Sequence, residues 1–211
     1  MSVVGTAQVQ CPACGAARDC ELVQSINART NPIAKERLLA GELNVLVCSC
    51  GRRSQLAATV LFHDPDATFS CQVCPGGDAA MARGAAAFEA SGAGGTLRLV
   101  PSLNALVEKV KILDAGLEDW ALEMTKVLLL ASLEVRDVDR VLLFDRVDRT
   151  RNVLRWMLFP QAGGAPESVS STLTAYDKLA ARSNARPTRT ELQIDRAWAM
   201  AAVRTMLVSA N

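Results

Sequence analysis

Two short cysteine pairs constrain this chain more than any other feature of its sequence. They stand in CPACG at residues 11–15 and in CSCG at residues 48–51. Two thiolates close together in a tight turn can bind one tetrahedral zinc ion. The glycine after each pair permits a positive φ, which lets backbone N–H groups point at the sulfur atoms. The pattern predicts one structural zinc site formed by Cys11, Cys14, Cys48 and Cys50.

The other three cysteines give a weaker signal. Cys71 and Cys74 have C-x-x-C spacing but no glycine after them, and they lie in a strand-like alternation. Positions three apart in a strand face opposite sides, so we interpret both as thiols of the core. Cys20 is isolated in the sequence and is interpreted as a buried residue. The second pair is one residue shorter than usual, which leaves open whether Cys48 or the reserve ligands Cys71 and Cys74 complete the site.

Metal binding is favoured over two other uses of cysteine. A cysteine can simply be a small buried hydrophobic residue, and disulfides are rare in a reducing cytosol. The N-terminus has no basic segment followed by a long apolar stretch, and no run approaches about 18 uninterrupted apolar residues. We therefore expect a cytoplasmic protein that does not enter a membrane.

Composition divides the chain into three regions. Residues 1–75 hold all seven cysteines, residues 76–96 are rich in glycine and alanine, and residues 97–211 show long apolar periodicities. We expect a zinc-ribbon region, then a linker or loop with at most a marginal helix around 78–90, then a helical region with a β-hairpin. A hairpin needs a partner surface. If it extended the first sheet, 97–211 and 1–75 would form one composite domain.

Apolar periodicity and turn residues predict the individual elements. The expected fold class is α+β, with a zinc-ribbon-like N-terminal antiparallel sheet and a C-terminal helical region that contains a β-hairpin. Strands are expected over 3–10, 18–28, 54–63, 67–74, 138–145 and 152–159, and helices over 32–41, 102–113, 116–132, 169–183 and 191–208.

Several motifs stand in an order that resembles the CpXC family of bacteria. They are CPACG, SIN at 25–27, LLAGELN at 38–44, CSCG, and LFHD at 61–64, and residues 103–126 are similar to a helical segment of long family members. We call the two cysteine turns, CPACG and CSCG, the first and the second knuckle. The chain departs from the family pattern because its second knuckle is one residue shorter and because Phe62 replaces a tyrosine. The resemblance implies zinc binding and brings no established reaction.

His63, the only histidine, is the main candidate for chemistry outside the cysteines. Beside Asp64 it could act as a base or as an extra metal ligand. The simpler interpretation is that Asp64 caps the turn before Pro65 while His63 makes a local hydrogen bond. We favour that interpretation, because no serine, threonine or lysine stands in a recognisable nucleophile context.

Charged residues on the two central predicted helices are a second candidate, since paired carboxylates can transfer protons. Their alternation with lysines is more typical of a solvated helix face. The residues concerned are Glu108, Lys109, Lys111, Glu118, Asp119, Glu123 and Lys126.

Arginines near the hairpin turn and in a later loop raise the question of nucleic-acid binding. They are Arg146, Arg149, Arg151, Arg155, Arg182, Arg186 and Arg189. Interspersed aspartates favour local ion pairing, and a net charge of +1 argues against a large phosphate-binding surface. The sequence thus favours a non-enzymatic binding or adaptor module for a protein partner, with structural zinc. The alternatives are a nucleic-acid-binding zinc ribbon and an enzyme that uses His63 with helix carboxylates. The oligomeric state stays open.

Overall fold

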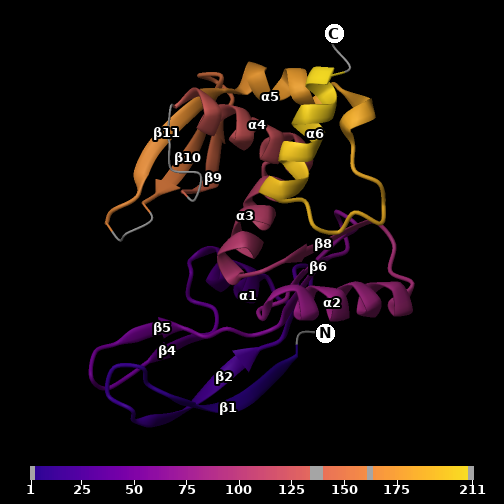
Figure 1. Ribbon diagram of the computed structural model, residues 1–211. Coiled ribbons are helices and arrows are strands. Elements are labelled where there is room, and N and C mark those ends of the chain that lie inside the picture. Colours follow the sequence, from indigo (N-terminus) through magenta and orange to yellow (C-terminus); the bar gives the residue numbers. More distant parts are fainter. Residues whose placement is uncertain (1–2, 134–139, 161–163, 209–211) are drawn as a thin grey trace. The chain divides into compact units, whose positions relative to one another are not determined.

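Both helices and strands build the structure, a computed structural model that describes residues 3–133, 140–160 and 164–208. The chain divides into two units, Met1–Val107 and Glu108–Asn211. The described residues contain six α-helices and both antiparallel and mixed sheets (Figure 1). The predicted α+β class is confirmed. No helix in the described part of the chain is both long and apolar enough to span a membrane.

Two antiparallel hairpins carry the cysteine turns of the first unit (Figure 1, indigo to purple). In the first, Val4 pairs with Val23 and Gln10 with Ala17, so the first cysteine pair lies in the turn. The second hairpin encloses the second pair in the same way. The strands are β1 (Val4–Gln10), β2 (Ala17–Val23), β4 (Val45–Val47) and β5 (Arg53–Gln55).

A four-stranded sheet with the order β3-β6-β7-β8 forms the rest of the first unit. It is mixed, because β3–β6 and β7–β8 pair in parallel and only β6–β7 is antiparallel. The strands expected over 18–28 and 54–63 are each divided in two, since their halves belong to different sheets. The strands are β3 (Ser25–Asn27), β6 (Val60–Asp64), β7 (Phe69–Val73) and β8 (Thr96–Val100).

Three helices accompany these strands. Helix α1 (Pro32–Leu39) begins where predicted, with the Asn31 side chain accepting a hydrogen bond from the Ala34 amide. The glycine- and alanine-rich segment forms helix α2 (Gly77–Ser91). This helix is longer than expected, because it packs against β8 and gains tertiary support that propensity alone does not supply. Helix α3 (Leu103–Asp114) crosses the boundary between the units.

The second unit packs helices on a three-stranded antiparallel sheet with the order β11-β10-β9. The expected hairpin is present, but the sheet includes no strand of the first unit. Residues 169–172 were expected to be helical and are strand instead, because β11 pairs with β10 from Glu167 to Thr172. Residues 138–139 of the expected strand lie outside the described residues. The elements are α4 (Asp119–Ser132), β9 (Val141–Asp148), β10 (Val153–Phe159), β11 (Glu167–Thr172), α5 (Leu173–Ala180), a 3-10 turn (Ser183–Ala185) and α6 (Arg196–Val208).

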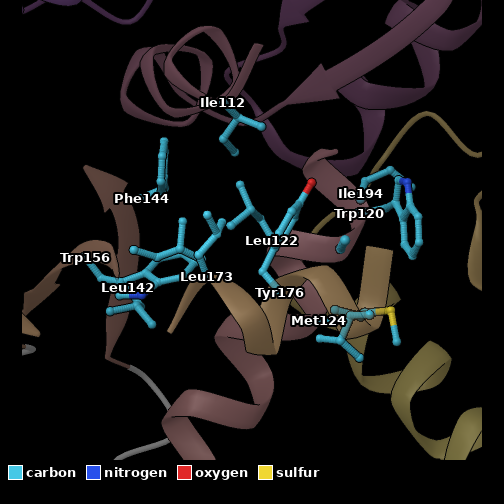
Figure 2. Close-up of a cluster of buried hydrophobic side chains, with 14 of the residues drawn as sticks. Ile112, Trp120, Leu122, Met124, Leu142, Phe144, Trp156, Leu173, Tyr176 and Ile194 are labelled. Carbon is cyan, nitrogen blue, oxygen red and sulfur yellow. The ribbon is translucent and has the colours of Figure 1, made fainter. Parts of the chain in front are cut away.

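The core of the second unit is rich in large side chains (Figure 2). The rings of Phe144 and Trp156 meet edge to face, with centroids 5.8 Å apart. The Trp156 indole donates to the Ser171 hydroxyl at 3.0 Å, and the Tyr176 hydroxyl accepts from the Glu118 amide at 2.8 Å. Buried aromatic residues that find partners for their polar atoms give a well-ordered core.

Candidate metal centre

The four cysteines of the two hairpin turns come together in space. Their sulfur atoms all lie within 4.8 Å of one another, and they could hold a metal ion. The Sγ atoms of Cys11 and Cys50 are 3.7 Å apart, and those of Cys14 and Cys48 are 3.6 Å apart. Each of these two contacts joins one knuckle to the other. Both hairpins are therefore needed to form the cluster.

Both turns follow the same backbone plan. In the first, Gly15 N donates to Cys11 O and Cys11 N donates to Ala16 O, each at 2.9 Å. In the second, Gly51 N donates to Cys48 O and Cys48 N donates to Arg52 O, also at 2.9 Å. Each bond of the second turn spans one residue less. The second turn therefore keeps the same bonding pattern although its C-x-C spacing is one residue shorter. In this pattern Cys48 makes the bonds that Cys11 makes in the first knuckle.

The glycines of both turns have the backbone conformation that the sequence predicted. Gly15 has a φ of 72° and Gly51 a φ of 85°. A Cβ atom added at either glycine would meet nothing within 4 Å. Conformation alone therefore favours glycine at these two positions.

Burial and backbone donors divide the four thiols into two kinds. Cys11 and Cys48 are buried, whereas Cys14 and Cys50 are exposed. The N–H groups of Ala13 and Cys14 lower the pKa of Cys11. The N–H of Cys50 lowers the pKa of Cys48 to about 6. At Cys14 the N–H of Ala16 also acts to lower the pKa, but the three neighbouring thiols raise it to about 11. A cation among the sulfurs would relieve that repulsion.

The remaining cysteines do not join the cluster. Cys71 and Cys74 are buried at 0% and 2% exposure, as expected for core thiols. Cys74 packs closely on helix α2, where a Cβ atom added to Gly84 would lie 2.7 Å from its sulfur. Burial raises the pKa of Cys74. Cys20 is only half-buried and packs against the small core around Cys11, Leu46 and Cys48.

His63 and Asp64 make the local contacts that the sequence favoured. The Nδ1 atom of His63 lies 3.0 Å from the Ser70 hydroxyl on the neighbouring strand. One carboxylate oxygen of Asp64 accepts from the amides of Asp66 and Ala67, at 3.1 and 3.3 Å. Asp64 therefore caps the turn between β6 and β7.

The charged residues of α3 and α4 do not form a solvated face, and that prediction is wrong for five of them. Glu108, Lys109, Asp119, Glu123 and Lys126 are 4% to 8% exposed. The three charged residues of α4 escape solvent because that helix is buried continuously from Asp119 to Lys126. Glu108 and Lys109 of α3 are buried in contact with them. A helix buried all round has no face left for solvated charges.

Lys126 lies at the centre of one half of this buried network. Its ammonium group donates to Glu108 and Glu123, at 2.8 and 2.9 Å, and Glu108 also accepts from the Phe144 amide. Burial raises the pKa of Glu108. Burial acts to lower the pKa of Lys126, but the two carboxylates raise it overall. The lysine is thus held charged inside the second unit.

Lys109 forms the other half of the network. It donates to the Asp119 carboxylate and to the Ile194 carbonyl, both at 2.8 Å, and lies 3.6 Å from a Glu123 oxygen. Burial acts to lower the pKa of Lys109, but Asp119 and Glu123 raise it overall. Glu123 therefore links the two lysines, and the network connects α3 and α4 with the segment before α6.

The arginines of the second unit largely pair with nearby groups, as the interspersed aspartates indicated. Arg146 lies 3.2 Å from Asp145, and Arg151 lies 3.8 Å from Asp148. Arg186 pairs with Glu118 at 3.1 Å. The arginine of each pair is exposed, so each pair adds little stability.

Comparison with known families supports the order of motifs read from the sequence. A family model described as CpXC protein matches residues 9–126, which is more than half of the chain. The matched region includes the four clustered cysteines and ends at Lys126. Comparison with curated proteins and with solved structures found no match for this chain.

Proposed function

Because the chain belongs to the CpXC family, we propose that its four-cysteine cluster binds one structural zinc ion in a zinc-ribbon-like module that recognises a protein partner in the cytoplasm. The observation that carries this proposal is the arrangement of the four sulfur atoms, which lie within 4.8 Å of one another. The sulfur spacing supports zinc as the metal, and the surroundings of the cluster support a structural role for it.

The spacing of the sulfurs fits a tetrahedral zinc–thiolate centre. Zinc–sulfur bonds of about 2.3 Å place the sulfurs of a regular tetrahedron about 3.8 Å apart. The two measured contacts, 3.7 and 3.6 Å, are close to that value. Soft thiolate ligands in a tetrahedral set favour zinc over harder ions such as magnesium or calcium.

The surroundings of the cluster support a structural role for the metal. Four protein ligands leave no position for a substrate or a water molecule. The apolar core beside the cluster is small, with only Leu46 and two of the ligand cysteines buried. Isolated two-stranded hairpins are marginally stable. Metal binding would supply the folding free energy that this part of the unit otherwise lacks.

A binding role follows from what a closed metal site can do. Its metal cannot take part in a reaction, so the work of the module falls to its surface. The turns around the cluster are exposed at Ala13, Ser49 and Arg52. Zinc ribbons commonly use such surfaces for recognition, which is an argument from fold-level analogy.

Metal analysis combined with co-purification tests this proposal. The purified protein is expected to contain one zinc per chain and to retain a specific protein from a lysate of its own source. Cys11→Ser should lose the metal and the partner together, because the module no longer folds. Cys71→Ser, which changes a buried cysteine outside the cluster, is the matched control and should keep both.

Two results would contradict the proposal. A folded protein that contains no zinc after purification without chelators would contradict the proposed structural zinc ion. Equal retention of the partner by Cys11→Ser and the wild type would contradict the proposed role of the module in partner recognition.

A further inference from the structure

The surface beside the second knuckle combines exposed arginines with an exposed apolar side chain. Val47 pairs directly with Arg53 across the β4–β5 hairpin, so both side chains lie on the same face. That face is turned away from the core, because the neighbouring residue Leu46 is 2% exposed whereas Val47 is 60% exposed. Arg52 lies in the knuckle turn itself and is also exposed.

Arg18 reaches the second knuckle from the other hairpin, from the side that it shares with Val9. Its guanidinium group donates to the Ser49 hydroxyl, between the two cysteines of the second knuckle. Arg18, Arg52 and Arg53 have no ion pair with an acidic residue in the described ranges of the chain. We call Val47, Arg52, Arg53 and Arg18 the knuckle face.

Acidic residues of the first hairpin lie on its opposite side. Arg18 stands across from Val9, whereas Asp19 and Glu21 stand across from Gln8 and Thr6. Successive side chains of a strand face opposite sides, so Asp19 and Glu21 point away from the side that Arg18 shares with Val9. The hairpin therefore separates its charges and leaves the arginine on the side of the knuckle.

The metal site would not cancel the positive charge of the knuckle face. Four thiolates outweigh the charge of a divalent ion, so a loaded site is itself anionic. The three guanidinium groups outnumber that excess, and all three arginines are exposed, whereas only two of the four cysteines, Cys14 and Cys50, are. Guanidinium groups bind carboxylates in a planar, bidentate manner.

We propose that the knuckle face binds an acidic, extended peptide segment of a protein partner, with carboxylates on the arginines and an apolar side chain on Val47. This inference rests on the proposed function and names the chemistry of the partner. The exposed valine favours a peptide over a nucleic-acid backbone, which offers phosphates without apolar side chains. The net charge of +1 for the whole chain also argues against a nucleic-acid backbone as the ligand.

Fluorescence anisotropy of the zinc-loaded protein tests the proposal with defined probes. A short labelled peptide of alternating valine and glutamate should bind, and the same peptide with lysine in place of glutamate should not. The double variant R52E/R53E should weaken binding by about tenfold or more, since it places like charges against the peptide. Val47→Ser should weaken binding to a smaller extent. Both variants must retain their zinc for the comparison to count.

Matched controls separate a specific effect from a change in net charge. R146E/R151E makes the same charge change on the second unit and should leave binding unchanged. If R52E/R53E loses zinc, R52Q/R53Q replaces it, with the same direction of effect expected. Absence of binding to the valine–glutamate peptide, equal weakening by the control, or tighter binding to single-stranded DNA would each overturn the inference.

The outcome also distinguishes this inference from the function on which it rests. A partner that depends on Cys11 but is retained by R52E/R53E would leave the zinc-dependent binding module in place and refute the knuckle face as its docking surface. A zinc-free folded protein would refute the module itself.

Discussion

The sulfur atom of Cys14 lies 3.6 Å from that of Cys48, although the two residues are 34 positions apart in the chain. Spacing left open which cysteine completes the proposed metal site, and this contact supports Cys48 as the fourth ligand. Cys48 reaches the site because its turn makes the same two backbone bonds as the first knuckle with one residue less. Cys71 and Cys74 are buried elsewhere in the first unit.

Single Cys→Ser variants should therefore divide into two groups. Removal of any one clustered thiolate leaves three ligands, so Cys14→Ser and Cys48→Ser should lower the zinc content well below that of the wild type. Cys74→Ser should contain as much zinc as the wild type. Metal analysis after gel filtration measures both. Full zinc content in Cys48→Ser together with loss in Cys74→Ser would contradict the assignment.

The cysteine cluster could be predicted because each of its halves is local. A cysteine pair, a tight turn and a glycine with positive φ all lie within five residues of sequence, and each has a stated physical reason. Only the meeting of the two turns depends on the fold. Helices α3 and α4 were predictable for the same reason, since their apolar spacing is a local pattern.

The buried ion network could not be predicted in this way. Asp119, Glu123 and Lys126 fall on one stripe of α4, and the same spacing is typical of an exposed salt-bridged face. Tertiary packing alone decides between the two, because Phe144 and Ile194 supply partners from distant segments. The division of residues 18–28 between two sheets has a similar cause, since pairing partners are not encoded in a single strand.

Substitution of the second knuckle glycine should weaken the metal site through the backbone alone. Gly51 has a φ of 85°, and a Cβ atom placed on it would lie in free space. Gly51→Ala should therefore cost about 1–2 kcal/mol of zinc-binding free energy, and Gly51→Asn should cost less. Competition with a chromophoric chelator measures both. Gly41→Ala, at a φ of 70° outside the knuckles, is the matched control and should leave zinc affinity unchanged.

Metal removal should act on the first unit and leave the second unit folded. All three tryptophans, Trp120, Trp156 and Trp198, belong to the second unit. A chelator should increase hydrogen exchange in β1, β2, β4 and β5, because those hairpins lose their cross-link. Tryptophan emission should not change. A chelator-induced red shift of that emission, or unchanged exchange in the hairpins, would contradict this expectation.

Loss of Lys126 should strongly destabilise the second unit. Lys126→Met leaves Glu108 and Glu123 buried without their shared cation, which should lower the free energy of unfolding by about 3–5 kcal/mol. The double variant E108Q/K126M should recover part of that loss, because the carboxylate that has lost its cation is gone while Glu123 keeps Lys109 nearby. Chemical denaturation followed by tryptophan emission measures both variants.

The same variant should change how stability depends on pH. Burial raises the pKa of Glu108, and the charge of Lys126 acts to lower it. In Lys126→Met this opposing effect is lost, so the pKa of Glu108 should rise further. A carboxyl whose pKa is raised in the folded state stabilises the fold below its unfolded pKa and loses that contribution as pH rises through its folded pKa. Lys126→Met should therefore regain stability on acidification relative to the wild type. Lys111→Met, which removes a half-exposed partner of Asp145, should show a much smaller loss at every pH. A constant difference between Lys126→Met and the wild type from neutral to acidic pH would show that the buried carboxylates are not responsible.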